Sequence, residues 1–329
     1  MQPTPSDVHV NKPLSNISVA FMQSAEDFVA DRVFPNIPVS FQSDVYYEFD
    51  RGFWNRAQMQ RRAPSSESAG SGYEVNADNA YRCDIWALHK DIDDRVRANA
   101  DVPLGPDREA TEWLSLQALL RREKLWASEF FASGVWTNDY AGVSSSPSGS
   151  QVLQWNDAAS TPIEDISDAK DIVKESTGFD PNKLVLGRQV YTKLKNHPDV
   201  IDRIKHSGHD AGRPAVANRR TMAALFEVDE VLVMAGIENT ADEGATNSHS
   251  FIGGKKAGLF YAPPRPGLMT PSAGYTFSWT GLLGNSALGG RTMKFRMDQL
   301  KSDRVEMEMA LDQKLVSADL GFFWDTVVA

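Results

Sequence analysis

Two short runs combine residue types that enzymes use, but neither makes a complete motif. Residues 253–256 (GGKK) have the glycines and lysines of a phosphate-binding loop, with the wrong spacing and no serine or threonine after the lysines. Ser167 and Lys170 have the spacing of the serine–lysine pair of some acyl-transfer enzymes, yet the companion motifs are absent. No G-x-S-x-G elbow is present either. We therefore predict no catalytic residue, no cofactor and no enzyme activity.

Histidine and aspartate residues that could bind a metal occur in two short clusters. His206, His209 and Asp210 lie in a polar stretch, where neighbouring histidines are usually solvated. A second cluster, residues 89–94, lacks the glycine and the later glutamate of a calcium loop. For this second cluster we expect a charged turn at the base of the extended segment described below. The sequence thus predicts no metal site.

A single cysteine, Cys83, is the remaining candidate nucleophile. One cysteine can form neither an intramolecular disulfide nor a cysteine-based zinc site, which fits synthesis in a reducing cytoplasm. Within residues 81–88, Cys83 lies on the apolar face of an alternating segment that predicts a strand. We expect a small buried side chain at this position and not a nucleophile.

The charge balance argues against two kinds of partner. Lys and Arg number 34 and Asp and Glu number 44, so the formal net charge is −10. Because nucleic-acid readers carry a basic surplus, tight sequence-specific binding to DNA or RNA is not expected. An acidic surface would repel nearby DNA and leave it mobile. No apolar run approaches the roughly 20 residues that cross a bilayer, so no membrane partner is expected.

The most unusual block of the sequence covers residues 41–136. Residues 45–54 and 81–88 are aromatic and β-branched, which predicts two strands, and about 26 residues separate them. A loop this long inside a compact domain is uncommon and is usually functional or mobile. We predict a projecting two-stranded ribbon, which a partner should complete because isolated ribbons are only marginally stable in water.

A long helix is expected directly after this ribbon. Pro106 suits the first turn, acidic residues follow it and basic residues come later, as the helix dipole favours. Over residues 106–132 such a helix would be roughly 40 Å long, and Gly134 is a suitable stop. A wide apolar stripe predicts a side that faces a core. The residues expected in this core are Trp113, Leu116, Leu120, Trp126 and Phe130.

The middle of the chain predicts an α/β unit. Thr161 and Glu164 fit a capping box at the start of a helix that ends near Gly178. Two short apolar runs predict buried strands at residues 183–186 and 231–234. Short helices are expected between these strands, at residues 188–195 and 199–206.

The two ends of the chain predict different structures. Residues 292–298 and 304–310 alternate, which predicts a hairpin in which basic residues of one strand face acidic residues of the other. Residues 1–40 contain several prolines but are too apolar for a solvated tail, which favours an extended arm lying on a neighbouring molecule. The arm residues expected to make this contact are Ile17, Phe21, Phe28 and Phe34.

The order of arm, extended loop, long helix, α/β middle and closing hairpin resembles the major capsid proteins of tailed bacteriophages with the Hong Kong 97-type fold. Three strings carry the resemblance: FQSDVYYEFDRGFW, YRCDIWALHKDIDDRVRANADVP and ATEWLSLQALLRREKLWASEFF. It implies an α+β fold and subunits that assemble as pentamers and hexamers into an icosahedral shell around DNA. The implied parts are an N-terminal arm at 1–45, an E-loop at 46–90, a peripheral domain at 91–159 with a spine helix at 106–133, a mainly axial domain at 160–285, and a return to the peripheral domain at 286–329.

The resemblance also implies a location and partners. The protein would be part of the virion and would assemble in the host cytoplasm, together with a portal protein and decoration or cement proteins. Because the arm begins almost at Met1, the scaffolding protein is expected to be separate. Packaged double-stranded DNA would be held non-specifically. Each E-loop would lie on a neighbouring subunit through the residues Arg51, Phe53, Trp54, Arg56, Arg61, Arg62, Pro64, Glu67 and Tyr73.

The loop composition adds one expectation, and two other functions stay open. Some relatives cross-link a loop lysine to a neighbour's asparagine, but residues 50–88 contain no lysine, so we expect a shell held by non-covalent contacts. An encapsulin-type nanocompartment shell protein would share the fold, and neighbouring genes would discriminate it. A soluble enzyme built on residues 160–235 is the third possibility, although no convergent acid/base or metal set supports it.

Overall fold

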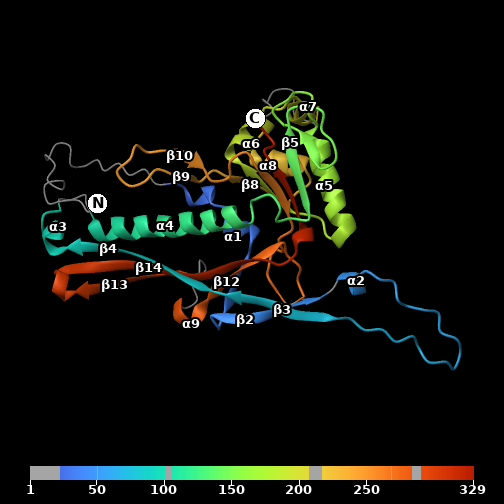
Figure 1. Ribbon diagram of the computed structural model, residues 1–329, viewed down its shortest axis with the longest axis horizontal. Coiled ribbons are helices and arrows are strands. Elements are labelled where there is room, and N and C mark those ends of the chain that lie inside the picture. Colours follow the sequence, from blue (N-terminus) through green and yellow to red (C-terminus); the bar gives the residue numbers. More distant parts are fainter. Residues whose placement is uncertain (1–22, 50, 101–104, 207–216, 268, 284–289) are drawn as a thin grey trace.

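The computed structural model describes residues 23–49, 51–100, 105–206, 217–267, 269–283 and 290–329. Two β-sheets and a long helix build an elongated body, and a thin two-stranded ribbon projects from one end of it (Figure 1). Helices and strands are mixed along the chain, which confirms the expected α+β class.

The larger sheet has six strands in the order β6-β5-β15-β11-β7-β8. β11 is antiparallel to β7 and β15, whereas the other neighbours in this sheet are parallel. β7, β8, β11 and β15 are almost entirely buried short apolar runs, as expected for strands that are covered on both faces. The strands are β5 Asn138–Val143, β6 Gln151–Leu153, β7 Lys183–Gly187, β8 Glu230–Met234, β11 Ala257–Phe260 and β15 Gly321–Asp325.

Helices pack beside this sheet and close its core. They are α5 Pro162–Thr177, α6 Arg188–Leu194, α7 Pro198–His206 and α8 Arg219–Leu225. Trp155 and Trp324 are fully buried in the shared core, with their rings 5.5 Å apart. The helices and strands expected in the middle of the chain are confirmed. The expected capping box is wrong, because the Thr161 side chain makes no capping hydrogen bond.

The second sheet contains five strands and lies under the long helix. Its path is β1-β12-β14-β13, and β4 pairs with β14. Ala110 and Leu114 of the helix pack on Ile92 and Val305 of this sheet. The strands are β1 Asn36–Val39, β4 Asp84–Asp93, β12 Gly274–Trp279, β13 Gly290–Met297 and β14 Ser302–Leu315, and the helices around them are α3 Asp94–Ala98, α4 Pro106–Glu129, α9 Thr280–Leu283, η2 Asp298–Leu300 and η3 Ala318–Leu320.

The closing hairpin is confirmed, and its charge pairing is largely as expected. The register of β13 and β14 places Arg291 opposite Glu308 and Arg296 opposite Asp303, and both pairs are in ion contact. Arg304 instead binds Asp91 of β4 on the other side of β14, at 2.7 and 2.8 Å. β14 is therefore the central strand that receives charge pairs from both neighbours.

The projecting ribbon is formed by β2 Ser43–Phe49 and β3 Val75–Arg82, which are antiparallel. α2 Arg51–Trp54 stands where the sequence predicts a continuing strand, so that expectation is wrong for these residues. Residues 84–88 do not belong to the ribbon either, because β4 begins at Asp84 and pairs with β14. A second, smaller ribbon joins β9 Ile237–Asn239 and β10 His249–Phe251.

The six-stranded sheet joins segments that lie far apart in the sequence. β5 and β6 lie in this sheet with β7 and β8. β15, near the end of the chain, lies between β5 and β11 of the same sheet. Hydrogen bonds between segments that are distant in the sequence determine this arrangement, and local residue patterns do not indicate which segments pair.

Candidate interaction surfaces

The outer end of the ribbon carries three aromatic rings in mutual contact. Phe49 lies 6.3 Å from Trp54 and 5.8 Å from Tyr73, and the last two rings are 5.6 Å apart. Trp54 is 53% exposed and Tyr73 is 60% exposed. They line a hollow of about 320 Å³ together with Arg56, Gln58, Met59, Ser71 and Gly72. Exposed aromatic rings beside a guanidinium are the residue types that dominate protein interfaces.

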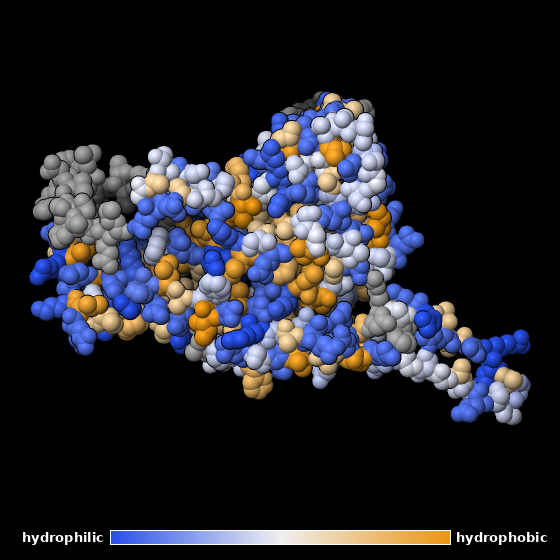
Figure 2. Space-filling model, viewed as in Figure 1, coloured by the Kyte–Doolittle hydropathy of each residue, from blue (hydrophilic) through white to orange (hydrophobic). Residues whose placement is uncertain are grey.

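The rest of the ribbon loop is polar and exposed. Arg56, Arg61, Arg62, Pro64 and Glu67 are all exposed. Arg62 donates a hydrogen bond to the carbonyl oxygen of Ser66 at 2.5 Å, which stiffens one turn of the loop. Figure 2 shows the ribbon standing clear of the body, with strongly hydrophilic residues near its tip. Among the other residues expected in this contact, Trp54 and Tyr73 belong to the aromatic group above, and Arg51 and Phe53 lie in α2.

The base of the ribbon is fastened to the body by stacked rings. Phe277 of β12 stacks on Tyr81 at 4.5 Å and on Tyr46 at 5.6 Å. Cys83 is fully buried beside them, and burial raises the pKa of its thiol to about 12. A thiol that stays protonated in an apolar site is a poor nucleophile. The expectation of a small buried residue at Cys83 is therefore confirmed.

The described part of the N-terminal segment is an integral part of the body. Phe28 is 3% exposed. Phe34 is 0% exposed and shares one core with Trp126 and Phe130 of the α4 region. The expectation that these two phenylalanines contact a neighbour is thus corrected, because their rings are already covered within the chain. Ile17 and Phe21 lie outside the described residues. The segment includes η1 Ala25–Asp27 and α1 Ala30–Val33.

The residues expected in the core of the long helix divide along its length. Trp126 and Phe130 are buried, as expected, although α4 ends at Glu129 and Phe130 is its C-cap. Leu116 and Leu120 are half-buried. Trp113 is 41% exposed, so its assignment to the core is wrong. The apolar stripe of α4 is wide, and its edge turns away from the sheet. The spacing of apolar residues in the sequence did not reveal this.

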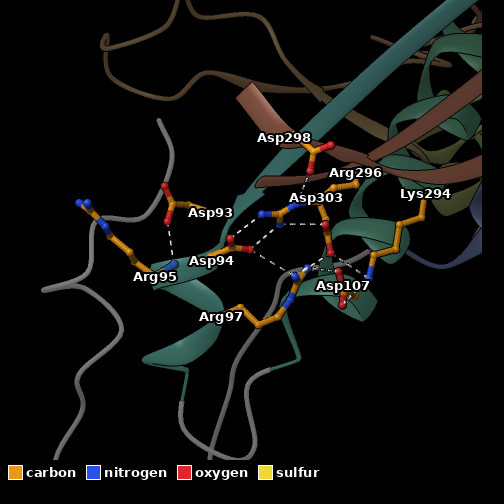
Figure 3. Close-up of polar contacts among 9 residues, drawn as sticks. All are labelled: Asp93, Asp94, Arg95, Arg97, Asp107, Lys294, Arg296, Asp298 and Asp303. Carbon is orange, nitrogen blue, oxygen red and sulfur yellow. Dashed lines mark hydrogen bonds and ion pairs between the residues drawn. The ribbon is translucent and has the colours of Figure 1, made fainter. Parts of the chain in front are cut away.

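A charged cluster joins the tip of the closing hairpin to the start of the long helix, at the end of the body opposite the ribbon (Figures 1 and 3). Asp303 of β14 is its centre. The side chain of Asp303 lies 2.6 Å from an Nη atom of Arg97, 3.2 Å from an Nη atom of Arg296 and 3.5 Å from Nζ of Lys294. One carboxylate thus connects α3, β13 and β14.

Two further carboxylates hold the arginines and the lysine of the cluster. Asp94 binds both Nη atoms of Arg296 at 2.6 Å, and Asp107 at the start of α4 lies 3.0 Å from both Arg97 and Lys294. Two-point binding by a guanidinium fixes orientation as well as charge. The charged turn expected at residues 89–94 is therefore wrong, because residues 89–93 belong to β4 and α3 begins at Asp94. The charged cluster stands at this end of β4 and not at the base of the ribbon.

Acid should loosen this cluster. Hydrogen bonds from Arg296 hold the pKa values of Asp94 and Asp303 below the ordinary range. Their contribution to stability is present above the ordinary aspartate value and is lost as the pH falls through the lowered value. We expect hydrogen exchange in the hairpin turn, residues 298–301, to rise several-fold on acidification below about pH 4, beyond the intrinsic change.

In the variant Asp303→Asn, hydrogen exchange in residues 298–301 should be faster already at neutral pH. The matched control is Asp242→Asn, since Asp242 is exposed in a loop after β9. Equal exchange in Asp303→Asn and the unchanged protein would mean that the cluster does not hold the turn. High salt should have a smaller effect in the same direction, because the ion pairs are partly screened.

The other polar candidates make structural contacts. Lys170 donates to the carbonyl oxygens of Phe226 and Glu227, and not to Ser167. Lys256 donates to the carbonyl oxygen of Phe131. The buried His197 contacts Ser160 at 3.1 Å, a pair that the sequence did not suggest. Its Nδ1 accepts from the Asp199 amide, so Nε2 carries the proton and cannot act as a base toward Ser160.

Metal binding and membrane crossing find no support in the described part of the chain. No group of three or more histidine, cysteine, aspartate or glutamate side chains there could hold a metal ion. His209 and Asp210 lie outside the described residues. Among the described helices, none combines the length and apolar character needed to span a bilayer.

Sequence comparisons relate the chain to phage proteins. The family model for phage major capsid protein E matches residues 152–273. The major capsid protein of Pseudomonas phage JBD67 is 27% identical over 325 residues, which cover 97% of each chain. The major capsid protein of Burkholderia phage BcepMu is 23% identical over 318 residues, which cover 95% of each chain.

Solved structures share the fold over nearly its whole length. A phage-related protein from Bordetella bronchiseptica superposes with a TM-score of 0.67 at 19% identity, over 92% of each chain. The capsid of cyanophage P-SCSP1u gives a TM-score of 0.59 at 11% identity, over 98% of each chain. The SrpI encapsulin of Synechococcus elongatus gives 0.55 at 11% identity, over 96% of this chain and 94% of that one.

A body of two sheets along one long helix, with a ribbon standing free at one end, defines this chain as a protein of the capsid fold class. Both curated relatives span nearly its whole length and come from phages, and the family model agrees with them. The chain is therefore similar to the major capsid proteins of phages over nearly its whole length.

Proposed function

We propose that this protein assembles into pentamers and hexamers, which close into an icosahedral shell around the double-stranded DNA of a phage. The observation that carries the proposal is the aromatic group at the ribbon end, Phe49, Trp54 and Tyr73, in which Trp54 and Tyr73 are exposed. It lies far from the body's own cores, and a single subunit leaves it uncovered. Burying rings of this kind is a main source of affinity at interfaces.

In this proposal the ribbon acts as the E-loop and lies on a neighbouring subunit. The aromatic group supplies the apolar contact, while Arg56, Arg61 and Arg62 pair with acidic side chains of that neighbour. The acidic balance of the chain supports pairing of this kind, because its net charge of −10 provides carboxylates. The role is structural and needs no catalytic residue.

The remaining partners follow from a shell that is filled with DNA. We propose a portal protein, a separate scaffolding protein and decoration or cement proteins as partners, with assembly in the host cytoplasm and a final place in the virion. DNA inside would be held without sequence preference, as the net charge favours. An encapsulin-type compartment shares the fold, but both curated relatives are phage proteins.

Electron microscopy of the expressed protein tests the proposal. We expect closed icosahedral particles, or pentamers and hexamers that close once a scaffolding protein is supplied. The symmetry of averaged particles is the measurement. A protein that stays monomeric at high concentration with and without scaffold would contradict the proposal.

We also expect the shell to be held without covalent bonds between subunits. Residues 50–88 contain no lysine, so the ribbon cannot supply the amine of an isopeptide bond to a neighbour's asparagine. Mature particles boiled in denaturant should run as a single band of one subunit, near 36.4 kDa, on a denaturing gel. Ladders of covalently joined subunits would overturn this expectation.

A further inference from the structure

A buried carboxylate connects the long helix to the N-terminal segment. Glu123 of α4 is 1% exposed. Its Oε2 accepts hydrogen bonds from the backbone amides of Val29 at 2.9 Å and Ala30 at 2.8 Å, and its Oε1 lies 3.0 Å from the Val29 amide. These amides open α1, whose own N-cap residue, Val29, makes no side-chain capping bond. Glu123 of α4 therefore caps the start of α1 from another helix, in place of a capping side chain at the N-cap position.

The charged groups around Glu123 leave it without a cation of its own. Its neighbour Arg122 is directed to Asp31 of α1, with a separation of 3.0 Å. Lys124 pairs with Glu238 of β9, and Arg32 of α1 pairs with Glu230 of β8. Within the described residues, no lysine, arginine or histidine lies within ion-pair distance of the Glu123 carboxylate. The space around it is the apolar core that contains Val29, Phe34 and Trp126.

This environment disfavours the charged form of the side chain. Burial raises the pKa of Glu123 to about 7; the amides of Val29 and Ala30 oppose the rise, Asp31 adds to it and Arg122 opposes it. When residues 28–34 open away from α4, the carboxyl becomes hydrated and regains an ordinary value near 4.5. The neutral form also keeps the contact, because a proton on Oε1 leaves Oε2 free to accept from both amides.

We propose that Glu123 is a proton-controlled clasp, which fastens residues 28–34 to the long helix firmly when its carboxyl is neutral and less firmly when it is ionised. The sign follows from linkage: the fastening is fully present at acidic pH and declines as the pH rises through neutrality. Glu123 is therefore a positioning residue for the N-terminal segment. The inference rests on contacts within one chain and does not require the proposed shell.

Hydrogen exchange of the full-length protein at two pH values tests the clasp. We expect the peptide that covers residues 28–34 to open on the order of tenfold more at about pH 8.5 than at about pH 5.5, after correction for intrinsic exchange. Peptides from α5 serve as the internal reference, because its buried residues Ile163, Ile166 and Val173 lie in a core that contains none of residues 28–34. The assembly state of each sample is matched by light scattering.

Three variants separate a clasp from a merely structural contact. Glu123→Gln is neutral at every pH and keeps an acceptor oxygen. In this variant, residues 28–34 should be protected from hydrogen exchange at both pH values, so the pH dependence should disappear. Glu123→Ala leaves two buried amides unpaired, so residues 28–34 should be poorly protected from hydrogen exchange at both pH values. Glu129→Gln, an exposed position on the same helix, should behave like the unchanged protein. An unchanged pH profile in Glu123→Gln, or full protection in Glu123→Ala, would overturn the proposal.

Discussion

The double variant Trp54→Ser with Tyr73→Ser is expected to abolish closed particles while the subunit stays folded. Both rings are more than half exposed, at 53% and 60%, and belong to a ribbon outside the body's cores. Their loss should change the free energy of unfolding by no more than about 0.5 kcal/mol. At an interface, buried Trp and Tyr residues are each worth about 2 kcal/mol or more. Because every subunit carries one ribbon, that loss recurs at each contact of the shell.

Particle yield by electron microscopy and subunit stability by urea denaturation measure the two effects separately. The matched control is Phe251→Ser, an exposed aromatic residue on β10 with 39% exposure. This control should keep both particles and stability. If the double variant forms particles in normal yield, the aromatic group does not make the contact proposed for it, whatever else the ribbon does.

The second large effect is expected inside the subunit, at Phe34. The ring is fully buried, 5.8 Å from Trp126 in an edge-on contact and 4.9 Å from Phe130. Phe34→Ala should lower the free energy of unfolding by about 3–5 kcal/mol, because it removes a large apolar side chain and leaves a cavity. Urea denaturation of the soluble subunit measures this loss.

Phe41→Ala is the control for this prediction. Phe41 is 67% exposed and lies only seven positions later in the chain, so its loss should change the free energy of unfolding by about 0.5 kcal/mol or less. Similar stabilities of the two variants would mean that residues 28–34 are not part of the core. A loss of stability in Phe34→Ala alone would mean that the N-terminal segment is held by contacts within its own subunit.

Two opposite responses to pH follow from the same physical chemistry. The carboxylates of Asp94 and Asp303 are stabilised as anions by Arg296, so acid weakens the hairpin end. Glu123 is buried without a partner cation, so acid strengthens the hold on residues 28–34. The body should therefore loosen at one end and tighten near its middle as the pH falls.

Glu123 could have been noticed from its position in the helix. It lies three residues after Leu120 and three before Trp126, inside the apolar stripe where a charged residue is costly to bury. The pattern indicates that something must compensate the carboxylate, but the compensating amides belong to residues 29 and 30. No spacing rule connects these residues to position 123.

The elements that depend on neighbours in the chain could be predicted from the sequence. Proline at the first turn and the dipole-matched charges predict the start of α4, and the alternating residues of β13 and β14 predict their hairpin. The aromatic and β-branched run predicts β2, and the apolar alternation predicts a buried Cys83. These features follow from periodicity, capping and turn chemistry, which act over a few residues.

The tertiary structure alone decided which segments are brought together. It placed β15 and β5 in the same sheet as β7, placed Phe34 in the chain's own core, and brought the charged cluster together at the hairpin end. The ring of Trp113 stayed partly exposed although its type suggests burial. Burial and long-range hydrogen bonds depend on which surfaces meet in space, and residue types along the chain do not specify that meeting.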